Sequence, residues 1–189
     1  MERLPRPRDV DDPVGSRVRE LASHLGERET VEVCVALLGG GRREDHVDAL
    51  RYLAGRSFGV GDEPPDPAVW KDYWLRTWGA RALLYVWDDA ASRAVVSGLD
   101  DEHWRPAEMC LKVVALREVA GAGDAAAALT RHELSRVRAQ AVRALGVVGD
   151  IEHVSVVRDR LSDQSSAPRR QSARALDRLA SRLDLADDP

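Results

Sequence analysis

The sequence predicts an all-α fold: a short right-handed α-solenoid of antiparallel helix pairs with an N-terminal helical extension. Three observations support this prediction. The segment 137–150, VRAQAVRALGVVGD, recurs in weaker form 62 residues earlier and 31 residues later. Its apolar residues follow the three- and four-residue spacing of one helix face. A period near 31 residues is typical of stacked helix pairs, in which each pair relies on its neighbours to bury apolar surface.

The N-terminal third of the chain is predicted to be helical after an irregular start. Residues 1–13 are rich in Pro, Arg and Asp, so we expect a disordered lead-in. The helical extension and its loop are expected over 14–66, with helices at about 14–25, 30–38 and 44–54. The loop covers 55–66, where repeated Gly and Pro disfavour regular structure.

The repeat array is expected over 67–183, followed by a tail at 184–189. Its first helix is predicted to be long, from Pro67 to about Trp87, with Asp66 as its N-cap. The next helix is expected to begin after a second cap, Asp88, which matches Asp150 in the later copy. The remaining helices are expected at about 89–99, 104–120, 125–132, 137–148, 150–161 and 167–183.

Small residues at equivalent positions indicate close contact between stacked helices. Helix axes approach to about 8–10 Å only where the side chains at the contact permit it. Ala144 is expected to lie in such a contact, and Leu145 to fill the space between layers. The middle copy, aligned at a 33-residue offset, places Lys112 where Gly79 and Ala141 stand, so we expect this copy to depart from the pattern.

The segment 137–161, VRAQAVRALGVVGDIEHVSVVRDRL, resembles the bacterial HEAT-like repeat, a type also found in phycobilin lyases. The residues that carry the likeness are Val137, Arg138, Ala141, Ala144, Leu145, Gly146, Gly149, Asp150, Leu161 and Asp163. The resemblance covers about 70–183 and implies a binding scaffold. In such a scaffold we expect Arg138 and Asp163 to join repeats through charge-assisted hydrogen bonds.

Three tryptophans form a stripe on the predicted long helix. Trp70, Trp74 and Trp78 are spaced by four residues, which places the indoles on one helix face. An exposed stripe could grip a peptide or stack on bases, with Trp70 and Trp74 as partner-binding candidates. The alternative, which we favour, is that the rings pack the helix onto the N-terminal helices.

Four arginines on the last predicted helix form a basic stripe. Arg170, Arg174, Arg178 and Arg182 are spaced by four residues, so each lies about 40° around the helix from the one before. They are candidates for contact with phosphate or with an acidic protein surface. The alternative, which we favour, is that they form the solvated outer face that a terminal repeat needs.

Several functional classes find little support in the sequence. The histidines and the two cysteines, Cys34 and Cys110, lack metal-ligand spacing, and no catalytic motif stands out, so we expect no metal, cofactor or catalytic residue. No apolar run is long enough to cross a membrane, and the N-terminus is not that of a signal peptide. We therefore expect a cytoplasmic protein with reduced thiols.

These features predict a non-enzymatic, protein-binding scaffold. One alternative is a DNA-interacting protein, since HEAT-like repeats also build the alkylpurine DNA glycosylases. Residues 131–183 carry a balance of +5, which favours that alternative, but the net charge of −4 argues against it. A bilin lyase is a further alternative that only the repeat type suggests.

Overall fold

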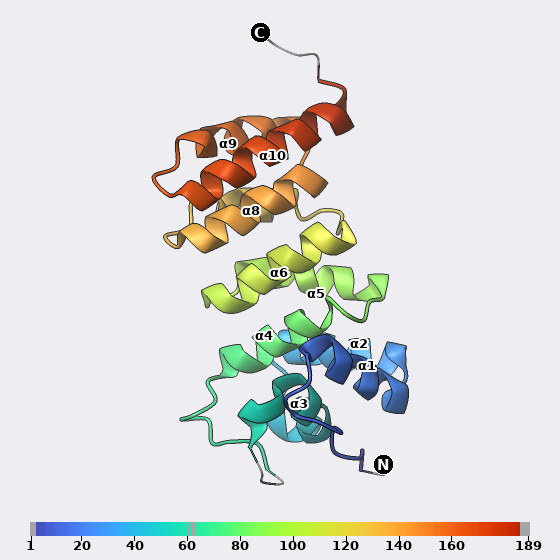
Figure 1. Cartoon of the computed structure of the whole chain (residues 1–189). Helices are drawn as coiled ribbons and strands as arrows, with labels where there is room; N and C mark the ends of the chain where they lie inside the picture. The colour runs from blue at the N-terminus through green and yellow to red at the C-terminus, as the bar shows by residue number, and fades with distance from the viewer. Residues whose placement is uncertain (1–2, 60, 62, 186–189) are drawn as a thin grey trace. The chain divides into compact units, whose positions relative to one another are not determined.

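The computed structural model describes residues 3–59, 61 and 63–185, and its regular structure is helical (Figure 1). Ten α-helices and several short 3-10 segments occur in this part of the chain, which contains no strand. The predicted all-α class is therefore confirmed. The chain divides into two compact units, Met1–Gly98 and Leu99–Pro189.

The first unit holds five α-helices: α1 (Val14–Leu25), α2 (Glu27–Leu38), α3 (Val47–Ala54), α4 (Asp72–Ala82) and α5 (Ser92–Ser97). Helices α2 and α4 pack closely against each other. A Cβ added at Gly79 of α4 would lie 2.5 Å from the Cys34 carbonyl oxygen of α2. The structure thus groups α4 and α5 with the N-terminal helices, whereas we predicted a boundary between residues 66 and 67.

A single residue, Gly26, links α1 to α2. Its φ of 91° lies in the region that glycine adopts without steric cost. This sharp corner lets α2 begin at Glu27, earlier than the predicted start at Thr30. Glu27 and Glu29 both lie in the first turn of α2, where a negative charge interacts favourably with the helix dipole.

Residues 3–13, which the composition predicts to be part of a disordered lead-in, contain no helix and form hydrogen bonds with later parts of the first unit. The Tyr52 hydroxyl donates to the Pro5 carbonyl oxygen at 2.7 Å, and the Arg56 N–H donates to the Val10 carbonyl oxygen at 3.3 Å. These partners lie far away in the sequence, so composition alone could not reveal them. The predicted lead-in also includes the first two residues, which lie outside the described part of the chain.

The long helix predicted over 67–87 is shorter in the structure. The Asp66 carboxylate accepts a backbone N–H two residues on, at 2.7 Å, but this bond closes only a turn, and α4 begins at Asp72. The Trp70 ring packs against Trp78, with centroids 4.4 Å apart. In a continuous helix these residues would be about 12 Å apart along the axis. The chain therefore leaves the helical path where it buries Trp70.

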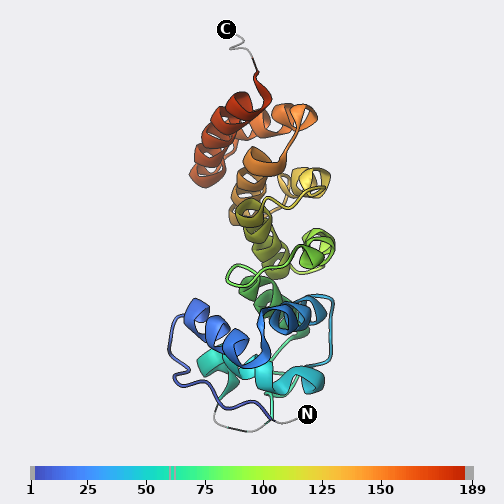
Figure 2. The ribbon, with the colours of Figure 1, turned by 90° about the vertical axis from the view of Figure 1, so that its right-hand side faces the viewer.

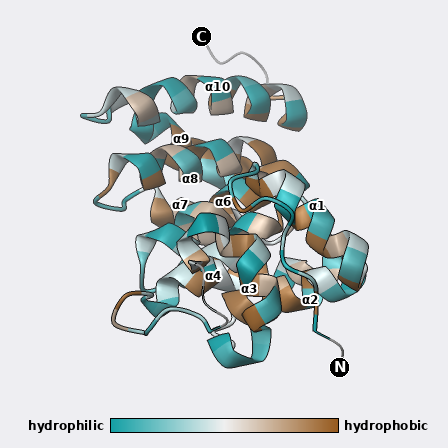
Figure 3. Cartoon of the chain, turned by 60° about the horizontal axis from the view of Figure 1, so that its bottom comes forward, coloured by the Kyte–Doolittle hydropathy of each residue, from teal (hydrophilic) through white to brown (hydrophobic). Residues whose placement is uncertain are grey.

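The second unit holds α6 (Trp104–Arg117), α7 (Gly123–Leu129), α8 (Ser135–Val148), α9 (Val154–Asp159) and α10 (Ser166–Leu183). Within it α8 contacts both α6 and α10, while α7 packs on α8 and α9 packs on α10. Figure 2 shows α6, α8 and α10 as one layer, with α7 and α9 beside it. In Figure 3 α10 is mostly hydrophilic, with apolar residues at intervals. Of the predicted tail, residues 186–189 lie outside the described part.

Buried positions in the α6, α8 and α10 layer recur every 31 residues. Two such sets are almost fully buried: Cys110, Ala141 and Ser172, and Val113, Ala144 and Ala175. The prediction that the middle copy departs from the pattern is therefore wrong. That prediction aligned Leu116 with buried leucines of the other copies. Leu116 is 52% exposed, so it does not belong to the set of buried positions that defines the repeat. In the correct register Lys112 is equivalent to Arg143 and Arg174.

The three helices of this layer also start in the same way. A side chain before each helix accepts the backbone N–H two residues on: Asp101, His132 and Asp163, at 2.8, 3.0 and 2.9 Å. Each bond satisfies a donor that the helix itself leaves unpaired. These acceptors are again 31 residues apart, so the local helix start and the buried core follow one period.

Candidate functional site

The four arginines predicted to form a basic stripe all lie exposed on α10, but they do not have one environment. Arg174 and Arg178 line a surface cavity between α8 and α10. Arg182 instead donates to the Gly149 carbonyl oxygen at the end of α8, so it caps that helix. Arg170 does not line this cavity. Arg174 and Arg178 therefore remain candidate binding residues, whereas Arg182 has a structural contact at the end of α8.

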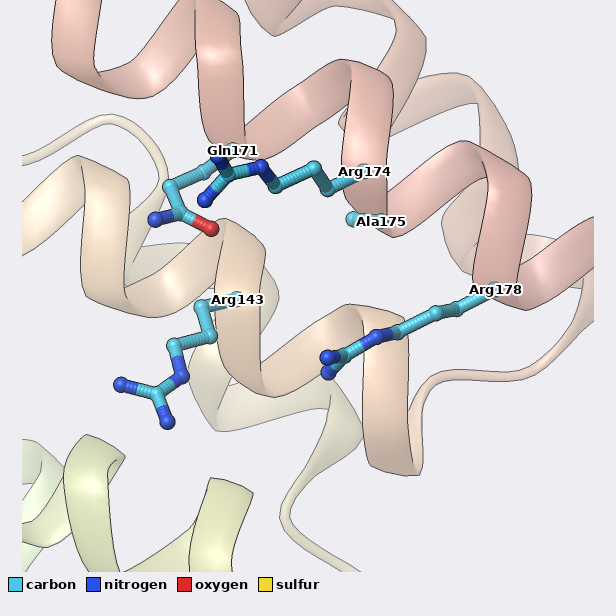
Figure 4. A pocket seen from close by; sticks show the side chains of 5 residues that line it. All are labelled: Arg143, Gln171, Arg174, Ala175 and Arg178. Atoms are coloured by element: carbon cyan, nitrogen blue, oxygen red, sulfur yellow. The ribbon is translucent and has the colours of Figure 1, made fainter.

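The cavity has a volume of about 220 Å³ and is lined by Arg143, Gln171, Arg174, Ala175 and Arg178. Figure 4 shows Arg143 extending from α8 and the other side chains extending from α10, with Gln171 beside the Arg174 guanidinium. Ala175 packs at the helix contact with only 2% of its surface exposed. The Arg178 side chain extends from α10 across to α8, whereas the Arg143 side chain points away from α10.

The electrostatics of this cavity favour an anion. Arg143, Arg174 and Arg178 are exposed, and none of them has a hydrogen bond or an ion pair with another described residue. Three like charges in one site repel each other unless a counter-charge is bound. A guanidinium can donate two parallel hydrogen bonds to a carboxylate or a phosphate. The geometry can therefore bind such a group, and it contains no nucleophile or general base.

Sequence reasoning missed Arg143, although a signal for it exists. It stands 31 residues after Lys112 and 31 before Arg174, so all three share one helix position in successive copies. The same spacing reaches back to Arg81 in the first unit. There the side chain donates to the Leu53 carbonyl oxygen at 2.8 Å and is not part of an open surface.

On α6, the positive charge of Lys112 is partly neutralised by a neighbouring carboxylate. Glu108 is only 4% exposed, and its carboxylate lies 3.1 Å from the Lys112 amine and 2.9 Å from the Arg136 guanidinium. Arg136 also lies over the Trp104 ring, 4.8 Å from its centroid. Two cations share one carboxylate, so this cluster keeps one net positive charge.

Apolar side chains lie one helical turn beyond Lys112 and Arg143. Leu116 of α6 is 52% exposed, and Val147 of α8 is half-buried. The equivalent position on α10 is Arg178. A second cavity, of about 480 Å³, is lined by Val147 and Arg178 together with Glu118, Gly146, Asp177, Ser181 and Arg182. The face that carries the arginines therefore presents both cationic and apolar side chains.

The tryptophan stripe of the first unit is mostly buried. Trp70 and Trp78 are 4% and 6% exposed, and Trp70 also packs edge-on against Phe58. Trp74 stacks on Trp78 with ring centroids 5.9 Å apart and is half-buried. Of the two predicted partner-binding tryptophans, Trp74 alone keeps an accessible edge.

The residues predicted to join repeats are all in the interior of the second unit. Arg138 and Asp163 are each 7% exposed and form a direct ion pair. Ala144 and Leu145 are fully buried. The Arg138 guanidinium also donates to the His132 carbonyl oxygen at 2.9 Å, so it holds the start of α8 to the turn before α10.

The thiols offer no reactive group. Cys34 and Cys110 are free and fully buried, and burial raises the pKa of Cys34 to about 12 and the pKa of Cys110 as well. Among the described residues, no group of His, Cys, Asp and Glu is arranged to hold a metal ion. No helix in that part of the chain has the length and hydropathy of a membrane span.

Comparison with known proteins adds support at the level of fold. No protein-family model and no curated protein matches the chain. Among solved structures, it is similar to the crystal structure of an engineered protein, with 20% sequence identity and a TM-score of 0.55. The match covers 91% of this chain and 86% of that chain. At this identity the likeness shows a shared helical fold and carries no functional information.

Proposed function

We infer that the chain is a non-enzymatic, protein-binding scaffold built as a short right-handed α-solenoid of HEAT-like helix pairs. One observation carries this proposal. The helices α6, α8 and α10 form one layer, and Lys112, Arg143 and Arg174 occupy the same position on each. A surface that repeats from helix to helix suits an extended partner. The proposal includes a cytoplasmic, bacterial setting and no cofactor.

The test is capture of partners by the immobilised chain, compared with a triple variant, Arg143→Glu, Arg174→Glu and Arg178→Glu. We expect at least one protein to bind the wild-type chain and to be lost from the variant. All three side chains are exposed, so the variant should keep its fold. Equal capture by both proteins would remove this surface from the proposal, and steady catalytic turnover by purified protein would contradict a scaffold role.

A DNA-interacting function is the second candidate, and the three unpaired arginines of the cavity favour it. Phosphate contacts would make binding strongly dependent on salt. The net charge of −4 opposes binding of a long polyanion. A gel-shift series with duplex DNA at low and high salt decides this point. Failure to bind at low salt eliminates the candidate.

A further inference from the structure

We propose that the partner of this scaffold is an extended, acidic protein segment that also carries apolar residues, bound across α6, α8 and α10 along a basic row. The basic row consists of Lys112, Arg143 and Arg174, with Arg178 one turn beyond. This inference rests on the proposed function and names the chemistry of the partner. Its support comes from the spacing, the charge and the mixed character of this face.

The spacing of the row selects an extended chain. Its members hold one equivalent position on three helices packed side by side (Figures 1 and 2). Packed helix axes are about 8–10 Å apart, so the cations recur at about that interval. A polyproline II segment rises about 3.1 Å per residue and has three residues per turn, so every third side chain recurs on one face after about 9 Å. Acidic residues at every third position would meet successive cations.

The available charge is concentrated at α8 and α10. Arg143, Arg174 and Arg178 have no partner among the described residues, and each can donate two parallel hydrogen bonds to a carboxylate. Lys112 already shares Glu108 with Arg136, so it contributes less. We therefore expect the strongest contacts at the two carboxylates that lie over Arg143 and Arg174.

The apolar residues on this face favour a protein over a nucleic acid. Leu116 and Val147 lie one turn from Lys112 and Arg143, and Leu116 is 52% exposed. A peptide can bury an apolar side chain against them, between its acidic residues. A phosphate backbone has no such group, and the chain's net charge of −4 repels a long polyanion.

The experiment measures fluorescence anisotropy of labelled peptides titrated with the full chain. The first peptide has four copies of Glu-Pro-Leu, and the second has the same composition with its glutamates together at one end. We expect the first peptide to bind at least about tenfold more tightly, because only its carboxylates match the row, and added salt should weaken it. Equal affinities, or no binding of either peptide, would overturn the inference.

Charge variants locate the site. Arg143→Glu and Arg174→Glu should each weaken the first peptide at least about tenfold. Arg158→Glu is the matched control, because Arg158 is exposed on α9 in the other layer and should leave affinity unchanged. If Arg143→Glu reduces helicity, Arg143→Gln replaces it and should still weaken binding. Equal loss in Arg158→Glu would mean nonspecific attraction and would contradict the proposed site.

A single-stranded oligonucleotide serves as the competing probe in the same assay. We expect the acidic peptide to bind more tightly than the oligonucleotide at equal ionic strength. Tighter binding of the oligonucleotide, with loss in Arg143→Glu, would assign the basic row to nucleic acid and overturn the inference. Partner capture by the immobilised chain is read separately, so a scaffold whose partner is not acidic would be recognised as such.

Discussion

Arg138 and Asp163 form a bidentate ion pair: the guanidinium Nε donates to Oδ2 and Nη2 donates to Oδ1, both at 2.7 Å. Asp163 also accepts the Ser165 N–H at 2.9 Å, and Arg138 donates to the Glu133 carbonyl oxygen at 2.8 Å. The pair satisfies two buried charges and several backbone groups at once. It therefore holds the starts of α8 and α10 together.

Removing one partner of this pair should destabilise the protein strongly. Arg138→Met keeps part of the stem but removes both short hydrogen bonds to the buried Asp163 carboxylate, which retains the Ser165 N–H and a longer contact with Arg160 at 3.7 Å. We therefore expect a cost near the lower end of the about 3–5 kcal/mol typical of a broken buried ion pair. The control is Arg143→Met on the same helix, where the side chain is exposed and unpaired, and the change should stay within about 0.5 kcal/mol. Urea unfolding of both variants measures the difference, and similar midpoints would contradict a stabilising role for the pair.

The same pair should make stability depend on pH in the acidic range. The hydrogen bond from Arg138 and the Ser165 N–H lower the pKa of Asp163 to about 2, against the opposing effect of burial. The ordinary value is about 3.9, so the ionised carboxylate contributes about 2–3 kcal/mol above pH 4, and this contribution is lost as the pH falls toward 2. We expect Asp163→Asn to be less stable than wild type at neutral pH, and this gap to narrow near pH 2. If the difference in unfolding free energy between the two proteins did not change with pH, the charge of Asp163 would make no contribution to stability.

Two substitutions on facing helices test the register of the layer. Ala144→Trp should unfold or open the second unit, because Ala144 is fully buried and overpacking a core costs about 1–3 kcal/mol even for smaller changes. Arg174→Ala should alter stability by no more than about 0.5 kcal/mol, since Arg174 is exposed. Thermal melts of the two variants measure both effects. Equal tolerance would show that the assignment of inward and outward positions is wrong.

The close approach of α2 and α4 depends on Gly79. Gly79→Ala gains helix propensity of about 1 kcal/mol, but its Cβ would lie 2.5 Å from the Cys34 carbonyl oxygen and 3.0 Å from the Leu38 nitrogen. We expect a net loss of about 1–2 kcal/mol, because the backbone atoms must move apart. The control is Gly39→Ala, whose Cβ would meet its nearest atom at 3.4 Å. A stabilised Gly79→Ala variant in chemical denaturation would contradict this packing.

The two buried cysteines can report on the opening of each unit. Cys34 lies in the first unit and Cys110 in the second, and both are fully buried with raised pKa values. We expect no alkylation by iodoacetamide at pH 8 in the folded protein and complete alkylation in denaturant. Mass spectrometry of digests taken at intermediate denaturant would show which unit opens first. Rapid labelling of either thiol in the native protein would contradict its burial.

The sequence by itself determined the positions of most helices. Periodicity predicted α1 at its observed bounds and α10 within one residue, because the apolar positions of a helix follow local geometry. Asp88 and Asp150 also cap the segments that follow them, as predicted, since a cap needs only residues close in the sequence. The buried state of Ala144 followed from the same pattern.

Only the tertiary structure decided which side chains meet across helices. Trp70 lies outside α4 and packs against Trp78, and Arg182 donates to the Gly149 carbonyl oxygen. Arg143 lines the same cavity as Arg174 and Arg178 of α10. Each of these contacts joins residues that local patterning treats as independent. Periodicity shows which side of a helix faces inward, but the distance between two helices depends on the small residues at their contact. The sequence therefore predicted the basic stripe on α10, whereas packing of α8 against α10 created the cavity that Arg143, Arg174 and Arg178 line.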